Sequence, residues 1–217
     1  SSTNWAQGGI AAAMSNSDLQ AHINDTIEAG CGLSQPEIVE MVVREAADRI
    51  EDLISSGVNF DSNEDGFDLA MEGGHSSRRI LHAKDATGAE IERALIIEAR
   101  ASPNLELLES HMAVDLILKD KSAEIKGIAG IWILTPNGEV RTISAQAIII
   151  ATGGAGHIYR QTTNPPVATG DGIAMGHSAG AKVRDLEFVQ FHPTALALPG
   201  ERPFLITEAL RGHGAIL

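Results

Sequence analysis

The sequence has little of several features that would assign it to particular classes of protein. One cysteine among 217 residues excludes an internal disulfide framework and any metal site built from several cysteines. Lys and Arg number 16 against 29 Asp and Glu, so the chain is far from the cationic balance that phosphate backbones require. No apolar run reaches the length of a membrane-spanning helix. We therefore expect neither nucleic acid nor a membrane among its partners, and no metal site.

The rest of the composition is that of a globular protein with a core. Hydrophobic residues make up 43% of the chain, and 217 residues suffice for one large domain or one and a half. The single thiol, Cys31, follows a glycine and is interpreted as a small packing residue rather than a reactive one. Sparse cysteine fits a reducing compartment, and we expect the cytoplasm. The chain has no initiator Met and opens inside a motif, which suggests a fragment.

Four segments have the apolar spacing of helices. The first and last cover residues 17–29 and 171–179. The second starts at Ser34 and stops at residues 55–57, and the third starts at Thr87 and ends before Pro103. In both of these a Ser or Thr stands three residues before a Glu, which is the spacing of a capping box.

Strand patterns begin after the third helix. Residues 105–108, 113–118, 127–134 and 140–144 predict a meander, with Asn137-Gly138 as its strongest hairpin turn. Residues 145–151 hold three consecutive isoleucines, which predicts a strand buried on both faces. A short strand is expected at 182–184. Helices and strands mixed in this way indicate an α/β or α+β nucleotide-binding architecture.

The segment from Glu72 to Ala83 gathers one acid, two histidines and two arginines around the pair Gly73-Gly74. Glycines allow the backbone to approach a ligand closely. A carboxylate beside imidazole and guanidinium groups would suit a pocket for a zwitterionic acid, and the alternative is a solvated polar loop.

Two further stretches could face a cofactor. Residues 1–13 are almost uncharged and rich in hydroxyl, amide and glycine groups, which suits a pyrophosphate and ring carbonyls, although a flexible tail would have the same composition. Gly153-Gly154 follows the predicted 145–151 strand, where open α/β sheets bind ligands, and a simple tight turn is the alternative. No G-x-G-x-x-G fingerprint follows an N-terminal strand.

Four other polar residues could have either a structural or a functional role. Asp171 could cap its helix or bind a ribose or ribityl hydroxyl. His192 lies in a segment of alternating polar and apolar residues and could be structural. Glu208 and Arg211 are three residues apart on one helical face, either as a surface ion pair or, if buried, as a path for protons.

Taken in this order, the stretches resemble the flavoprotein family of succinate dehydrogenase and fumarate reductase, and within it the L-aspartate oxidases. The resemblance covers essentially the whole chain. Eight motifs carry it: Ser-Thr-x-x-Ala-Gln-Gly-Gly (2–9), Glu-Gly-Gly-His-Ser-x-x-Arg-Ile-Leu-His-Ala (72–83), Asp-x-Thr-Gly (85–88), Ala-Thr-Gly-Gly (151–154), Thr-Thr-Asn-Pro (162–165), Gly-Asp-Gly (170–172), Phe-His-Pro-Thr (191–194) and Thr-Glu-Ala-Leu-Arg-Gly (207–212).

The resemblance implies FAD as cofactor and a Rossmann-like FAD-binding domain with a β-meander. Relatives that bind flavin covalently have a histidine where this chain has Ser2, so the FAD is expected to be non-covalent. The implied cofactor-binding residues are Ser2, Thr3, Asn4, Trp5, Ala6, Gln7, Gly8, Gly9, Met112, Ala113, Thr152, Gly153, Gly154, Asn164 and Asp171.

The resemblance also implies a substrate site and a reaction. Glu72 would orient the ammonium group of L-aspartate, while His192, Thr207 and Glu208 hold carboxylates or line a proton path with Arg211. The implied reaction is the oxidation of L-aspartate to iminoaspartate, with oxygen or fumarate as acceptor, as the first step of NAD biosynthesis. Quinolinate synthase would be the downstream enzyme. Two alternatives to this function remain. The chain could belong to a fumarate reductase or succinate dehydrogenase flavoprotein subunit, or it could be an inactive flavoprotein fragment.

The chain departs from the family pattern in two respects. His213 stands where the family usually has a glutamate. The family's dinucleotide fingerprint would precede residue 1, and its main catalytic arginine would follow Leu217. We expect residues 1–185 to form the FAD-binding domain and 186–217 to begin a capping domain, with the fragment alone inactive.

Overall fold

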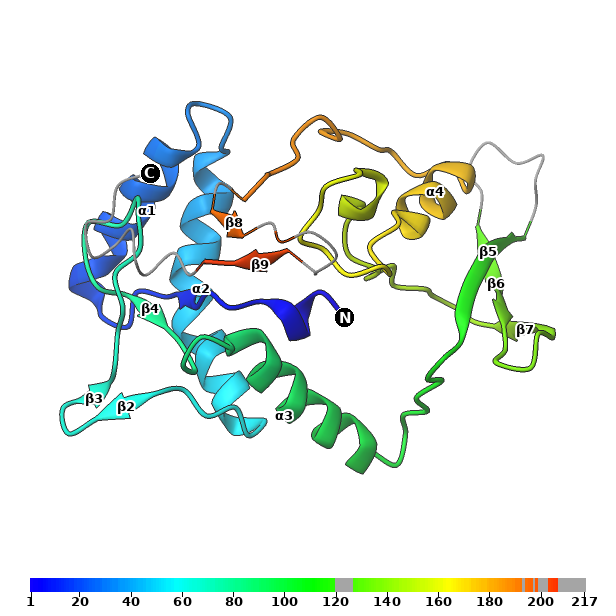
Figure 1. Ribbon diagram of the computed structural model, residues 1–217, viewed down its shortest axis with the longest axis horizontal. Coiled ribbons are helices and arrows are strands. Elements are labelled where there is room, and N and C mark those ends of the chain that lie inside the picture. Colours follow the sequence, from blue (N-terminus) through cyan, green and yellow to red (C-terminus); the bar gives the residue numbers. More distant parts are fainter. Residues whose placement is uncertain (120–126, 193, 197, 199–202, 207–217) are drawn as a thin grey trace. The chain divides into compact units, whose positions relative to one another are not determined.

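The computed structural model describes residues 1–119, 127–192, 194–196, 198 and 203–206 (Figure 1). The chain divides into two compact units. The first holds Ser1, residues 3–104 and the described residues from Thr194 on, and the second holds Ser2 and residues 105–192. This division neither confirms nor excludes the boundary near residue 185, which stays a prediction.

Three helices form the frame of the first unit. They are α1 (Asn16–Ala29), α2 (Pro36–Ser55) and α3 (Thr87–Ala101), and α1 packs against α2. Each matches a helix predicted from apolar spacing. The second begins two residues later than predicted because Pro36, whose fixed φ suits a first turn, opens it.

Neither predicted capping box forms. The residues before α2 and α3 are Gln35 and Ala86, and neither makes a side-chain capping bond. Thr87 lies inside α3, where its hydroxyl accepts the Ala83 N–H, and the Glu90 carboxylate accepts the N–H of Asn59 from a distant loop. At Glu90 a tertiary partner therefore replaces the local one that the spacing suggested, while Thr87 bonds to the preceding loop.

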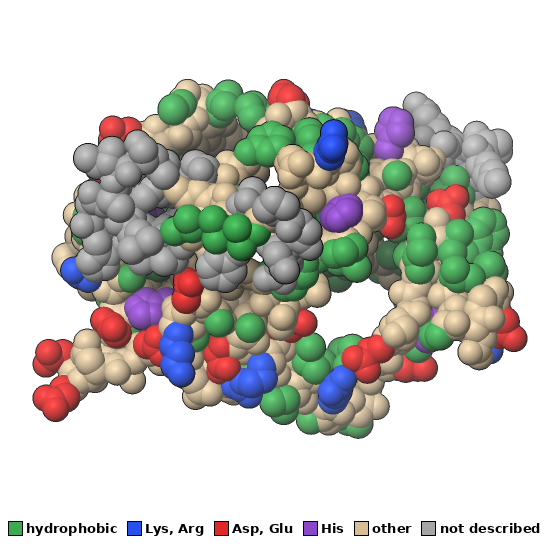
Figure 2. Space-filling view, in the orientation of Figure 1, with side chains coloured by type: hydrophobic (Ala, Val, Ile, Leu, Met, Phe, Trp, Pro, Cys, Tyr) green, Lys and Arg blue, Asp and Glu red, His purple; other side chains and the backbone are tan. Residues whose placement is uncertain are grey.

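Short antiparallel pairs complete the first unit. The strands β1 (Ile10–Ala11) and β4 (Ile80–Leu81) pair with Ile10 opposite Leu81. A hairpin joins β2 (Ser62–Asn63) to β3 (Gly66–Phe67), and β8 (Ala195–Leu196) pairs with β9 (Phe204–Leu205). The β2–β3 hairpin presents exposed acids, visible in red at its tip in Figure 2. None of these two-residue strands was predicted.

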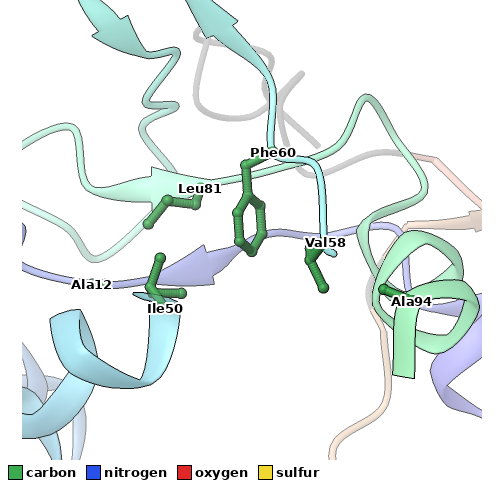
Figure 3. Close-up of a cluster of buried hydrophobic side chains, with 6 residues drawn as sticks. All are labelled: Ala12, Ile50, Val58, Phe60, Leu81 and Ala94. Atoms are coloured by element: carbon green, nitrogen blue, oxygen red, sulfur yellow. The ribbon is translucent and has the colours of Figure 1, made fainter. Parts of the chain in front are cut away.

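The core of the first unit lies between α2, the β1–β4 pair and α3. Figure 3 shows its buried side chains: Ala12, Ile50, Val58, Phe60, Leu81 and Ala94. Ile50 on α2 is 2% exposed, and Leu81 on β4 is fully covered. This core fixes the position of β1 and β4, whose neighbouring residues carry the predicted site.

The second unit contains the predicted meander. The strands β5 (Met112–Leu118), β6 (Ile128–Leu134) and β7 (Val140–Ser144) lie in that order, all antiparallel. Gly138 has φ = +81° in the turn before β7, as the Asn-Gly pair predicts. The helix α4 (Asp171–Ser178) contacts β5.

Three predicted strands are wrong. Residues 105–108, 145–151 and 182–184 lie outside the strands of the described chain. The isoleucine run fails because an apolar segment becomes a buried strand only beside a pairing strand, and no described strand pairs with it. Ile149 is 90% exposed, while Ile150 lies against Gly172 of α4.

The mixture of helices and strands confirms the α/β class that the sequence predicted. No helix among the described residues is both long enough and apolar enough to cross a membrane.

Candidate functional site

The N-terminal segment packs on the start of α3. The N–H of Gly88 donates to the carbonyl oxygen of Ala6 at 3.0 Å, and a Cβ atom on Gly88 would collide with the carbonyl oxygen of Thr3. The Gln7 amide donates to Asp85 at 2.9 Å. The segment is thus fixed to α3 rather than extending as a tail, and it leaves Asn4 and other neutral donors exposed.

Glu72 lies beside this segment. Its Oε1 atom is 3.8 Å from the position that a Cβ would take on Gly8, so the carboxylate faces glycine backbone. Gly9 next to it lies against the carbonyl group of Leu81, which ties the segment to β4. Glu72 is half-buried, and within the part of the chain that the structure describes no group is hydrogen-bonded or ion-paired to its carboxylate.

A tight turn carries Glu72. The N–H of His75 donates to the carbonyl oxygen of Glu72 at 3.3 Å, and Gly74 has φ = +84°. Residues with a Cβ rarely adopt that conformation, so glycine is required there. A Cβ on Gly73 or Gly74 would have none of the described residues within 4 Å.

Arg79 is not available to a ligand, so its guanidinium group does not contribute to the zwitterion pocket that the segment suggested. Its side chain is 1% exposed. Nε and Nη2 donate to the two carboxylate oxygens of Asp18, each at 2.8 Å, and Nη1 donates to Asp25 at 2.5 Å. The alternative of a solvated loop is equally wrong at this residue, because its charge is buried against α1.

The histidines of the segment also have protein partners. Arg79 Nη1 lies 3.0 Å from Nδ1 of His75, which must accept because a guanidinium only donates. His82 Nδ1 is 3.1 Å from Asp61. Exposed Arg78 reaches only the carbonyl oxygen of Leu69, at 3.4 Å. Of the charged groups proposed for a zwitterion pocket, the Glu72 carboxylate alone lacks a described partner.

Charge and burial shift three pKa values around Arg79. Hydrogen bonds from the Ser76 backbone and from Arg79 hold the pKa of Asp25 well below its usual range. The Arg79 hydrogen bonds lower the pKa of Asp18 in the same way. Burial, and then the charge of Arg79, lower the pKa of His22, whose ring lies 5.8 Å from that of His75.

The second unit brings together another part of the predicted cofactor residues. A Cβ on Gly172 would collide with the Thr152 hydroxyl, and one on Gly156 would collide with the Asn164 amide. The turn after residue 151, the loop around Asn164 and the start of α4 are therefore in contact. Gly153 has φ = +73°, with open space beside its Cα.

Asp171 is the first residue of α4 and is exposed. It makes no capping bond, because the preceding residue is Gly170 in the left-handed conformation. The helix-capping alternative for Asp171 is therefore wrong, and its carboxylate stands at the positive end of the helix dipole.

Some of the remaining predicted site residues belong to the described part of the chain, and the others do not. Met112 and Ala113 open β5, opposite Leu134 and Ile133. His192 is half-buried in the second unit and follows Phe191, whose ring packs edge-on against Tyr159. Thr207, Glu208, Arg211 and His213 lie outside the described residues.

Comparison with known proteins identifies the family. Residues 1–217 match the family model described as an FAD binding domain, and the chain belongs to this family. An L-aspartate oxidase of Nicotiana tabacum is 48% identical over all of this chain and 35% of its own length. The L-aspartate oxidase of Vibrio cholerae is 46% identical over 99% of this chain and 42% of its own length.

A solved structure has the same architecture. The chain superimposes on E. coli quinol fumarate reductase with a TM-score of 0.87 and 32% identity, over 99% of this chain and 36% of that one. This chain thus spans about a third to two fifths of the length of these relatives.

The residues present fit the FAD that defines the family. The segment at residues 1–9 offers hydroxyl, amide and backbone donors with no charge, and glycines at 8 and 9 leave little bulk. Gly153 and Gly154 leave open backbone in the second unit. Uncharged donors and bare backbone are what pyrophosphate and ring carbonyls require.

Proposed function

We propose that the chain is part of an FAD-dependent enzyme that oxidises L-aspartate to iminoaspartate, with oxygen or fumarate as the final acceptor. One observation carries this proposal. The half-buried Glu72 carboxylate lies against Gly8 and has no described partner, while the neighbouring cations are paired within the protein. An unpaired carboxylate is best satisfied by a cationic group on a ligand.

Glu72 would select an amino dicarboxylate. Succinate and fumarate carry no amine, so an acid beside them repels their negative charge. The ammonium group of aspartate turns this repulsion into a charge-assisted hydrogen bond worth about 1.5–3 kcal/mol, or roughly ten- to a hundred-fold in affinity. The names of the tobacco and Vibrio relatives support the same choice of substrate.

FAD supplies the two-electron acceptor when bound. The segment from Ser2 to Gly9 would hold it through neutral donors, and Ser2 offers no imidazole for a covalent link. In the second unit Thr152, Gly153, Gly154, Asn164 and Asp171, with Met112 and Ala113, would provide its other contacts.

The carboxylates of the substrate need further partners. We assign His192, Thr207 and Glu208 to their binding and Glu208 with Arg211 to a proton path, with residues 1–185 as the FAD-binding domain and 186–217 as the start of a capping domain. The main catalytic arginine would come from beyond Leu217. Iminoaspartate is unstable in water, so an enzyme such as quinolinate synthase would consume it, and we propose the cytoplasm as the compartment.

The test uses Glu72→Gln in the product of the complete gene. The affinity for aspartate should fall roughly ten- to a hundred-fold, and that for fumarate should change less than about threefold, since only aspartate loses an ionic partner. Ligand-induced shifts in the thermal midpoint measure both affinities. Glu64→Gln, an exposed acid in the β2–β3 hairpin, is the control and should leave both unchanged.

Equal losses for aspartate and fumarate would reject the ammonium role of Glu72. A wild-type protein that oxidises succinate and ignores aspartate would instead establish the alternative activity, that of a fumarate reductase or succinate dehydrogenase subunit.

A further inference from the structure

We infer that Asp25 on α1 is a positioning residue that, with Arg79, holds the turn carrying Glu72 and thereby sets the preference for an amino dicarboxylate. The inference rests on the proposed function, because it concerns the same substrate site. It adds a residue some fifty positions away in sequence from Glu72, whose hydrogen bonds in the described chain go to Ser76 and Arg79.

Asp25 binds the turn directly. Its Oδ2 atom accepts the backbone N–H of Ser76 and the Ser76 hydroxyl, both at 2.8 Å, together with Nη1 of Arg79. The Asp25 side chain is 16% exposed, so water competes little for its carboxylate oxygens. One carboxylate oxygen therefore fixes both the main chain and a side chain just after the turn.

Arg79 connects Asp25 to His75. Its Nη1 group, bound to Asp25, also faces His75 Nδ1 at 3.0 Å. The N–H of His75 in turn closes the turn on the carbonyl oxygen of Glu72. A continuous series of contacts thus runs from Asp25 through Arg79 and His75 to the backbone of Glu72.

The turn needs these outside hydrogen bonds because its own residues make few stabilising contacts. Within the described part of the chain, no residue lies near enough to Gly73 or Gly74 for an added Cβ to meet it, and glycine has more backbone freedom to lose than any other residue. Without Asp25 the backbone N–H of Ser76 would lose its acceptor, and the turn would keep the 3.3 Å bond between His75 and Glu72 and the contacts of Arg79 with His75 and Ser76. The main chain just after the turn, and with it the Glu72 carboxylate, would then be held less firmly.

The chain offers a closely matched control on α3. Glu90 also accepts hydrogen bonds from an arginine, Arg93, and from a loop backbone N–H, that of Asn59. Its loop carries no predicted site residue. Removing either carboxylate should cost stability, but only the loss of Asp25 should alter the choice of ligand.

The experiment compares Asp25→Asn with Glu90→Gln in the product of the complete gene. We expect Asp25→Asn to weaken aspartate about tenfold and fumarate less than about threefold, as measured by ligand-induced thermal shifts and by KM. Glu90→Gln should lower the thermal midpoint and leave the ratio of the two affinities unchanged. Equal weakening of both ligands by Asp25→Asn would overturn the inference.

A double mutant separates positioning from general damage. If Asp25 acts through Glu72, Asp25→Asn should have no further effect on the preference for aspartate in a Glu72→Gln background. Additive effects would overturn the inference. Should Asp25→Asn fail to fold, Ser76→Ala removes one of the three bonds to Asp25, and we expect the same selective loss at about two- to threefold; no selective loss would also reject it.

The two proposals fail in different ways. If Glu72→Gln does not discriminate aspartate from fumarate, the proposed function fails. If Glu72→Gln discriminates and Asp25→Asn does not, only the positioning role of Asp25 fails.

Discussion

Gly88 and Thr3 are in direct backbone contact, with no room for a side chain between them. A Cβ on Gly88 would collide with the Thr3 carbonyl group and would also approach the side chain of Ala6 at 2.7 Å. The first turn of α3 therefore serves as the platform on which the N-terminal segment rests.

Gly88→Ala should displace that segment and weaken FAD binding. Alanine normally stabilises a helix relative to glycine, so a loss would arise from the collision, at about 1–3 kcal/mol. Flavin content after purification and titration with FAD measure the effect. Gly127→Ala is the control, since among the described residues only the flexible Lys119 side chain lies near that position. Unchanged FAD affinity in Gly88→Ala would show that the segment does not contact the cofactor.

The FAD should leave the protein on denaturation. Ser2 stands where covalently flavinylated relatives have a histidine, and a hydroxyl there would contribute at most a hydrogen bond. Precipitation with acid should release all yellow colour into the supernatant, as measured by absorbance. Flavin retained in the washed pellet would contradict the non-covalent assignment.

The Glu90 carboxylate should make stability depend on pH in the acidic range. Hydrogen bonds from Arg93, and then from Asn59, lower the pKa of Glu90 to about 2 from 4.5. A lowered folded-state pKa means that the stabilisation is present above pH 4.5 and disappears as the pH falls toward 2. With Arg93 partly exposed, we expect about 1–2 kcal/mol rather than the full value of the shift.

Denaturant unfolding of the wild type and Glu90→Gln measures this contribution. The difference between the two should be largest at pH 5–7 and should shrink between pH 4.5 and 2. Glu40→Gln removes an exposed pair with Arg44 and should change stability by less than about 0.5 kcal/mol at any of these pH values. A difference for Glu90→Gln that does not vary with pH would contradict the assignment.

Local patterns predicted local structure well. The apolar spacing of α2 and the Asn137-Gly138 turn depend on residues within a few positions of one another, and both appear as expected.

Long-range relationships could not be derived from the sequence. The burial of Arg79 could not be predicted, because its partners Asp18 and Asp25 lie 61 and 54 positions away and nothing in the local sequence shows that α1 reaches it. The spacing of Asp18 and Asp25, two helical turns apart on one face, was the signal that could have indicated a buried cation. The motif resemblance named Glu72, but only the coordinates show that its neighbours are already paired.

The isoleucine run at residues 145–151 has a practical consequence. Seven consecutive uncharged residues, three of them β-branched isoleucines that include the 90% exposed Ile149, have the composition that promotes intermolecular β-sheet association. The tendency of this chain to aggregate during expression and concentration should therefore depend on how well residues 145–151 are covered. Covering this segment should raise the solubility of the protein at high concentration.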